Sequence, residues 1–365
     1  MTGAAMEHVT AAAVTVPTDR AESDGTLEWD ATTIVVVEVT AGGETGLGYT
    51  YGDAAIADVV TNTLAAVLRG RDALAPGAAF AAMTRAVRNS LASGLVGYAI
   101  SAVDIALHDL KARLLGVALA DLLGRWHEGI EIYGSGGFTS YSLDELREQA
   151  AGWKELGLRR VKIKVGRDPA ADPERLAAVR ETIGEDVALM VDANGAFTPA
   201  RALAAAQTYA RHDVSWFEEP VSSDDHDGLR RVRDAAPPGM EIAAGEYGSD
   251  VFHFQRLLSA GAVDVLQADA TRCGGVTGVL RADALAKAHG LPLSAHCAPA
   301  VSAHVFAACE TAVHIEYFHD HVRVERELFD GTLEPDGGRL TPDASRPGLG
   351  LSLRRARAAV AAATG

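Results

Sequence analysis

The sequence has few cysteines, which argues against a disulfide framework. Its 365 residues include three, Cys273, Cys297 and Cys309, an odd number without CxxC spacing. Disulfide scaffolds of secreted proteins and cysteine-rich metal sites use paired, closely spaced cysteines. We therefore expect reduced thiols in a cytoplasmic protein.

Positive charge is also scarce. The chain carries 33 Lys and Arg residues against 49 Asp and Glu residues, a formal net charge of −16. Such a protein repels phosphate backbones and anionic lipids, which argues against nucleic-acid and membrane-surface partners. No apolar run approaches the roughly 18 residues that span a bilayer, and we expect no signal peptide because the N-terminus lacks a charged segment followed by a long apolar one.

The residues that are present predict a globular protein of about two domains. Hydrophobic residues make up 48% and charged residues 22%. Residues 11–17, 32–40 and 46–52 read as strands, and residues 53–124 show helical spacing of apolar residues. We predict an α+β domain over residues 1–126, in which the polar segment 17–30 forms a mobile loop.

After Trp126, short apolar runs alternate with helix-length amphipathic stretches. Eight strand candidates follow one another with the sequences EIYGSGG, VKIKV, ALMVDANG, SWFEEP, EIAAGE, VDVLQADA, LPLSAHC and HIEYF. This α/β rhythm predicts parallel βα units, and eight of them favour a closed barrel over a doubly wound sheet. We place the barrel at residues 127–330 and expect residues 331–365 to pack back on the first domain.

Ionisable residues recur at the ends of these strands, separated by 20 to 28 residues, about one βα unit each. The C-terminal strand ends of a parallel barrel meet at one mouth. The series is Lys162 and Lys164, Asp192, Glu218, Glu246, Asp269, His296 and Glu316.

Three carboxylates in this series, Asp192, Glu218 and Glu246, come from successive strands. Three anions in a partly dry pocket repel one another, and a hard divalent cation relieves the repulsion. Ligation by oxygen alone favours Mg²⁺. The alternative for each residue is a helix N-cap or a surface ion pair, but neither explains the regular spacing.

The remaining members of the series are acid–base candidates. Lys162 and Lys164 lie on one face of a strand, where each should lower the pKa of the other. An exposed edge strand is the alternative for this pair. Asp269 could orient the imidazole of His296 and raise its basicity. Glu316 is either an acid or a partner for a nearby basic residue.

These motifs resemble the enolase superfamily, and within it the mandelate racemase subgroup. The segments SAVDIALHDLKARLLG, VKIKVG, VDANG, WFEEP, AAGE, LQADATRCGG and SAHCAP carry the resemblance, which covers nearly the whole chain. It implies an N-terminal α+β capping domain on a modified (β/α)7β TIM barrel, and a homo-oligomer.

The resemblance also implies residue roles. Mg²⁺ would bind the three carboxylates, with Asn194 and Glu219 beside them. Lys164 would be one base, with Lys162 as its electrostatic partner. His296, held by Asp269, would be the acid or base on the opposite face. Glu316 would donate a hydrogen bond to the substrate carboxylate.

Removal of the proton α to a carboxylate follows from this set of groups. Loss of water from a sugar acid, giving a 2-keto-3-deoxy acid, is the first expectation because dehydration is common in this subgroup. Racemisation, epimerisation and cycloisomerisation use the same enolisation. A non-catalytic binding protein on the same scaffold is a further alternative, as is a metal-dependent hydrolase, although a hydrolase would use His-rich ligation.

Substrate choice is expected to lie in the first domain. Residues 20–30 and 48–53 are the candidate segments, with Asp24, Trp29, Tyr49 and Tyr51 as possible contacts. The first segment holds several acidic residues but a single basic one, Arg20. This charge balance favours a monocarboxylic sugar acid, or a cyclic relative, over a diacid.

Overall fold

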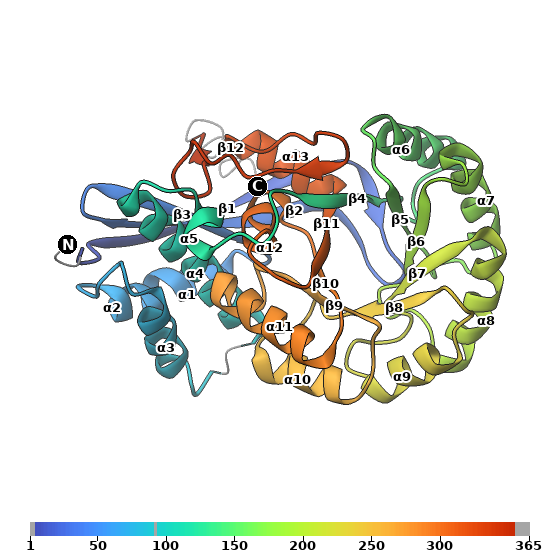
Figure 1. The fold of residues 1–365 in the computed structure, drawn as a ribbon, viewed down its shortest axis with the longest axis horizontal. Helices are drawn as coiled ribbons and strands as arrows, with labels where there is room; N and C mark the ends of the chain where they lie inside the picture. Colours follow the sequence, from blue (N-terminus) through green and yellow to red (C-terminus); the bar gives the residue numbers. More distant parts are fainter. Residues whose placement is uncertain (1–3, 91–92, 355–365) are drawn as a thin grey trace.

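The computed structural model describes residues 4–90 and 93–354. Figure 1 shows an N-terminal domain at one end and a ring of strands surrounded by helices at the other. The N-terminal sheet is antiparallel, in the order β1 (His8–Ser23), β2 (Glu28–Ala41), β3 (Glu44–Tyr51). The helical part that follows comprises α1 (Ala55–Val59), the π-helix η1 (Val60–Leu64), α2 (Ala65–Leu68), α3 (Pro76–Ala86), α4 (Gly94–Leu115) and α5 (Leu119–Leu123).

Strand β2 is apolar on both faces because each face contacts a different core. Val35 and Val37 pack in the cluster that includes α4, whereas Ile34 and Val36 belong to the cluster shared with the barrel. Side chains alternate between the two faces of a strand. A continuous run of valines therefore joins the two domains.

The barrel contains eight parallel strands within the described residues, and it closes because β11 pairs with β4. The strands are β4 (Ile130–Gly136), β5 (Arg160–Lys164), β6 (Ala188–Asp192), β7 (Val214–Glu218), β8 (Glu241–Ala244), β9 (Val265–Ala268), β10 (Leu293–Ala295) and β11 (Ala312–Phe318). The helices between them are α6 (Leu143–Glu155), α7 (Asp172–Ile183), α8 (Pro199–Tyr209) with the 3₁₀ turn η2 (Ala210–His212), α9 (His226–Ala235), α10 (Val251–Ser259), α11 (Gly275–His289) and α12 (Pro299–Phe306). The predicted capping domain and (β/α)7β barrel are confirmed.

The segment predicted as a loop is largely a β-hairpin, so that prediction is wrong. Strand β1 continues to Ser23 and β2 begins at Glu28, with a register shift between Pro17 and Glu22. Polar side chains on these strands find partners in the barrel: Ser23 Oγ, for example, lies 2.6 Å from Thr139 Oγ1. These partners are more than 100 residues away in sequence. The polar composition of the segment, taken alone, therefore predicts a loop.

The C-terminal segment after α13 (His319–Leu328) contacts both domains. It contains β12 (Phe329–Asp330), which pairs with β14 (Ser352–Leu353), and β13 (Arg339–Leu340), which pairs with β4 of the barrel. The backbone N–H of Leu349 donates to Asp109 of α4 at 2.6 Å. Residues 355–365 of the predicted tail lie outside the described residues, and the proposed domain limits at 126 and 330 stay predictions.

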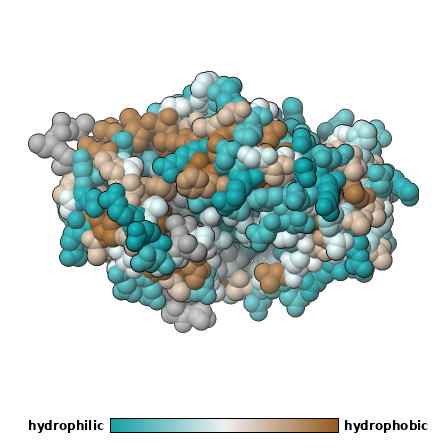
Figure 2. Space-filling view, turned by 90° about the horizontal axis from the view of Figure 1, so that it is seen from below, coloured by the Kyte–Doolittle hydropathy of each residue, from teal (hydrophilic) through white to brown (hydrophobic). Residues whose placement is uncertain are grey.

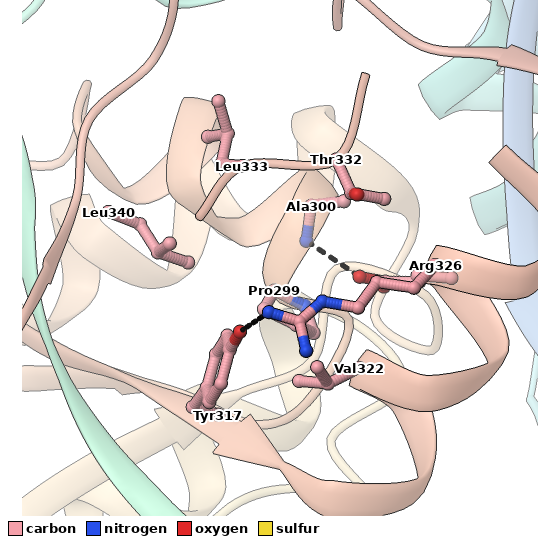
Figure 3. A pocket seen from close by; sticks show the side chains of 9 residues that line it. Pro299, Ala300, Tyr317, Val322, Arg326, Thr332, Leu333 and Leu340 are labelled. Atoms are coloured by element: carbon pink, nitrogen blue, oxygen red, sulfur yellow. Dashed lines mark hydrogen bonds between the residues drawn. The ribbon is translucent and has the colours of Figure 1, made fainter. Parts of the chain in front are cut away.

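A small cavity lies between this segment and α13. Figure 3 shows Arg326 reaching across it to the hydroxyl of Tyr317, at 3.0 Å, with Leu333 and Leu340 of the C-terminal segment on its far side. The residues around the cavity come from the barrel, from α13 and from the C-terminal segment. The cavity therefore lies where the C-terminal segment packs on the barrel.

The outer surface is mixed in character. Figure 2 shows hydrophilic side chains over most of one face, with apolar areas gathered towards the end that holds the capping domain. Among the described residues, no helix combines the length and hydropathy needed to cross a membrane.

The close packing of α4 on β3 yields a stability prediction. A Cβ at Gly48 would lie 2.1 Å from the carbonyl oxygen of Ala102 in α4. Gly48→Ala must push the helix away from the sheet, and overpacking of this kind costs about 1–3 kcal/mol. Urea unfolding should show this loss, whereas Gly77→Ala, which meets open space in α3, should unfold like the wild type. Equal unfolding midpoints for Gly48→Ala and the wild type would contradict the prediction.

Candidate active site

The series of ionisable residues meets at the mouth of the barrel. Lys164, Glu246, His296 and Glu316 line one cavity together with Asn194. Each of these residues lies in the C-terminal part of a barrel strand or just after it, so the strand register sets where its side chain points. The capping domain closes the other side of the cavity, with lining residues Asp24, Leu27, Trp29, Ala31, Thr32, Thr33, Tyr51, Gly52 and Asp53.

The three predicted metal carboxylates come together. Asp192, Glu218 and Glu246 each offer an oxygen within 4.8 Å of the other two, and all three residues are buried. Burial raises the pKa of Glu218 to about 8. Burial acts in the same direction on Asp192, but Lys164 and Lys162 outweigh it and hold the pKa of Asp192 below its ordinary value.

Unsatisfied oxygens beside this group test whether a cation fits. Asn194 Oδ1 and Glu219 Oε1 are buried and accept no hydrogen bond from the described residues, and Glu246 Oε2, also without a hydrogen bond, lies 3.3 Å from His296 Nε2. Asn194 and Glu219 also have positive φ angles, 47° and 37°, which is uncommon for residues other than glycine. Buried polar atoms without partners are costly. The donor set is all oxygen, so the residues present fit Mg²⁺.

Both lysines are buried, and each forms ion pairs with carboxylates. Lys162 Nζ lies 2.7 Å from Glu218 and 2.8 Å from Glu316, and Lys164 Nζ lies 2.5 Å from Asp192. Burial lowers the pKa of each lysine, but the carboxylates outweigh it and raise both pKa values. Lys162 does lower the pKa of Lys164, as expected, but Asp192 raises it by more, so the expected net lowering is wrong.

The imidazole of His296 lies against Asp269 on the other side of the mouth. His296 Nδ1 is 2.7 Å from Asp269 Oδ2, and Thr271 donates to the second oxygen, Oδ1, through both its backbone N–H and its hydroxyl. His296 lines the cavity, and its other ring nitrogen, Nε2, lies 3.3 Å from Glu246 Oε2 and 3.4 Å from Cys297 Sγ. Burial lowers the pKa of His296, but Glu246 and Glu316 outweigh it, so the pKa is raised.

Glu316 accepts hydrogen bonds in this structure, and its expected role as a donor to a substrate carboxylate stays a prediction. Ser135 Oγ donates to Oε1 at 2.5 Å, and the backbone N–H of Cys297 donates to Oε2 at 3.1 Å. Burial raises the pKa of Glu316, but Lys162 and His296 outweigh it and hold the pKa well below its ordinary value.

Arg272 was not predicted, although it follows the Asp269 strand in the segment ADATRCGG. Its guanidinium lies 3.3 Å from Glu246 and 3.4 Å from Asp269, and it stacks over Tyr98 of α4 and Tyr247. Arg272 thus links a metal carboxylate, the carboxylate behind His296 and the capping domain. The signal in the sequence that could have indicated Arg272 is its position three residues after Asp269, at the same strand end.

The specificity candidates divide into two groups. Asp24, Trp29 and Tyr51 line the cavity. Tyr49 does not line it: Tyr49 is fully buried and donates to Glu325 at 2.5 Å. Asp24 caps the hairpin tip, since its Oδ1 accepts the backbone N–H groups of Thr26 and Leu27, and so it has a structural use besides facing the cavity.

Two family matches cover most of the chain. Residues 9–124 match the N-terminal domain of mandelate racemase / muconate lactonizing enzymes, and residues 145–357 match the enolase C-terminal domain-like family. The chain belongs to the mandelate racemase/muconate lactonizing enzyme family of the enolase superfamily. The resemblance found in the motifs is thereby confirmed.

Solved structures of family members superpose closely. A mandelate racemase/muconate lactonizing enzyme-like protein from Rubrobacter xylanophilus is 57% identical, with a TM-score of 0.96 over 97% of this chain and 99% of that one. A racemase from Streptomyces coelicolor with bound magnesium is 30% identical, with a TM-score of 0.91 over 97% and 99%. Magnesium in that relative agrees with the oxygen donors found here.

Relatives of named activity catalyse more than one reaction. The D-galactarolactone cycloisomerase of Agrobacterium fabrum is 32% identical over 90% of this chain and 91% of that protein. The L-talarate/galactarate dehydratase of Salmonella typhimurium is 35% identical over 72% of this chain and 64% of that protein. Family membership thus leaves a lyase and an isomerase open.

The hairpin tip gives a prediction specific to this family member. A Cβ at Gly25 would lie 2.3 Å from the carbonyl oxygen of Ala193 and 2.8 Å from that of Val165, both at barrel strand ends. Gly25→Ala should lift the tip from the barrel mouth. We expect the amide hydrogens of Thr26 and Leu27 to exchange with solvent about 5- to 150-fold faster, because overpacking of this kind costs about 1–3 kcal/mol. Gly152→Ala, which meets open space, is the control, and unchanged exchange in Gly25→Ala would count against the close approach.

A second prediction concerns the family's metal site. Glu246→Gln removes one anionic ligand oxygen, and we expect Mg²⁺ affinity in calorimetry to fall by at least about tenfold. Glu241→Gln, at the exposed opposite end of the same strand, should leave it unchanged. Wild-type affinity in Glu246→Gln would exclude Glu246 as a ligand.

Proposed function

We propose that this enzyme is an acid-sugar dehydratase: it removes the proton α to the carboxylate of a sugar acid and then eliminates water from the β-carbon. The observation that carries the proposal is the placement of two acid–base groups around one carboxylate cluster. Lys164 ends β5, and His296 follows β10. Four strands separate β5 from β10 on one side of the ring and two on the other, so the two groups face the cavity from different sides.

The first step is proton abstraction. Lys164 Nζ accepts the proton from the α-carbon, and the electron pair of that C–H bond moves into the carboxylate to give an enediolate. Mg²⁺ bound by Asp192, Glu218 and Glu246 would supply the positive charge that stabilises this anion and lowers the pKa of a neighbouring lysine. Lys162, between Glu218 and Glu316, keeps those carboxylates in place and adds a fixed positive charge.

The second step is loss of the β-hydroxyl. His296 Nε2 donates its proton to the leaving oxygen, the C–O bond breaks, and water departs as the electron pair of the enediolate forms the C–C double bond. Asp269 stabilises the protonated imidazole that must exist before this step. The resulting enol tautomerises to a 2-keto-3-deoxy acid.

The charges in the cavity favour a monocarboxylic sugar acid. Among the described lining residues, Lys164 and Arg272 are the Lys and Arg side chains, and each already contacts carboxylates. The capping side instead contributes Asp24 and Asp53. A second substrate carboxylate there would meet like charge, whereas hydroxyl groups could donate to these acids.

A cycloisomerase is the second candidate because relatives of both activities match nearly all of the chain. The D-galactarolactone cycloisomerase matches 90% of this chain in sequence, and the structure of the talarate/galactarate dehydratase covers 98% of it. Racemisation or epimerisation would need the same two groups, with the proton returned to the α-carbon from the opposite side. A homo-oligomeric state and a cytoplasmic location stay predictions.

Proton NMR in D₂O distinguishes these reactions. With Mg²⁺ and a panel of sugar acids, lactones and small 2-hydroxy acids, a dehydratase should remove the α-proton signal and produce 2-keto-3-deoxy resonances. Exchange at the α-carbon without loss of water would instead indicate a racemase or epimerase, and conversion of a lactone to an isomer of equal mass would indicate a cycloisomerase. Exchange with no compound of the panel would count against the proposal.

Lys164→Ala tests the assigned base on whichever substrate turns over. We expect activity to fall by at least about 10²-fold while Mg²⁺ binding persists, because loss of a general base removes a factor of about 10²–10⁴. Lys287→Ala, which alters a surface pair with Glu310, is the control. Wild-type turnover in Lys164→Ala would show that the base is another group.

A further inference from the structure

A second cluster of metal-ligand side chains lies outside the cavity, where the hairpin meets the start of α13. Asp19 and Glu22 belong to β1, and His319 is the first residue of α13. These three residues each offer one ligand atom within 4.8 Å of the other two. None of the three belongs to the carboxylate group that fits Mg²⁺.

Glu22 is the unusual member of this cluster. Its side chain belongs to a residue only 1% exposed, and Oε1 is buried without a hydrogen-bond partner among the described residues. Its other oxygen, Oε2, accepts from Trp29 Nε1 at 2.7 Å. A buried carboxylate oxygen without a partner is costly, and an ordinary structural carboxylate would be expected to use both oxygens.

The surroundings of Glu22 are acidic. Burial, together with the neighbouring Asp320 and Asp19, raises the pKa of Glu22 to about 8, although Trp29 and Arg323 act in the opposite direction. His319 Nε2 lies 3.1 Å from Asp19 Oδ2, so an imidazole already sits among these acids. A cation on the three groups would satisfy Glu22 Oε1 and relieve the repulsion between the carboxylates.

The donor set differs from that of the Mg²⁺ site. It combines one imidazole nitrogen with two carboxylate oxygens, whereas Asp192, Glu218 and Glu246 offer oxygen alone. Imidazole suits Zn²⁺ and its first-row neighbours, while sites built only from oxygen suit Mg²⁺. The chemistry therefore favours a transition metal at this second position.

We propose that Asp19, Glu22 and His319 form a second divalent-metal site, for Zn²⁺ or a similar transition metal, that ties strand β1 to helix α13. The bound ion would fix Glu22, whose hydrogen bond holds Trp29 against the cavity. Trp29 also contacts Phe138 edge to face, with ring centroids 5.5 Å apart. The site thus acts on the wall of the substrate cavity without touching the proposed acid–base groups, and it does not depend on which reaction the enzyme catalyses.

Calorimetry with Zn²⁺ in the presence of saturating Mg²⁺ tests the site, using the full chain without a histidine tag. Excess Mg²⁺ occupies the oxygen-only site and reduces competition there. We expect one Zn²⁺ per chain, with affinity lowered at least about tenfold in His319→Gln and in Glu22→Gln, because each removes a ligand. His289→Gln, an exposed histidine of α11, is the matched control and should bind Zn²⁺ like the wild type.

Two further readouts make the result specific. Co²⁺ in place of Zn²⁺ should give d–d absorption in the visible region whose position and intensity change in His319→Gln, because replacing a ligand changes the coordination geometry and the ligand field. Zn²⁺ should also raise the thermal unfolding midpoint of the wild type but not of His319→Gln. Absence of Zn²⁺ binding under saturating Mg²⁺, or equal binding by the wild type and His319→Gln when both are folded by circular dichroism, would overturn the proposal.

Discussion

The structure depends on the mutual neutralisation of charges buried at the barrel mouth. Asp192, Glu218 and Glu316 would each be strongly destabilising alone, because an isolated charge away from water loses several kcal/mol of hydration. Here Lys162 contacts Glu218 and Glu316, and Lys164 contacts Asp192. The same pairing brings acid, base and metal-binding groups within reach of one substrate, so the groups needed for chemistry are also the groups that make burial tolerable.

The capping domain completes this arrangement from outside. Its hairpin tip reaches the barrel mouth because Gly25 lets the backbone approach the strand ends at Val165 and Ala193. The cavity is thereby walled on one side by the ends of the barrel strands and on the other by Trp29 and Tyr51 of the cap. In the proposed mechanism, enolisation uses groups of the first wall, and the second wall would position the β-carbon of the substrate.

Arg272 shows how the two walls are joined. Its guanidinium contacts Glu246 and Asp269, and stacks over Tyr98 of the capping helix α4. A shift of the cap would therefore move Arg272 relative to Glu246 and to Asp269, the carboxylate that holds His296. Arg272 therefore brings the cap into contact with the proposed metal site and with the carboxylate that holds His296.

The sequence by itself determined the barrel, the capping domain and the groups at the mouth. This was possible because the spacing of one βα unit and the polar residue at each strand end are local patterns, and parallel closure brings such ends together whatever the loops contain. Asp192, Glu218 and Glu246 are predictable for that reason, as is the pairing of Asp269 with His296.

Only the tertiary structure decided how those groups are charged and what surrounds them. Lys164 was expected to have a lowered pKa from its neighbour, but Asp192 contributes the larger effect. Glu316 accepts a hydrogen bond from Ser135, which is 181 residues away. Tyr49 does not line the cavity, because its hydroxyl donates to Glu325, 276 residues away. Contacts of this range leave no local pattern, since they depend on two segments that meet only when the cap and the barrel are packed together.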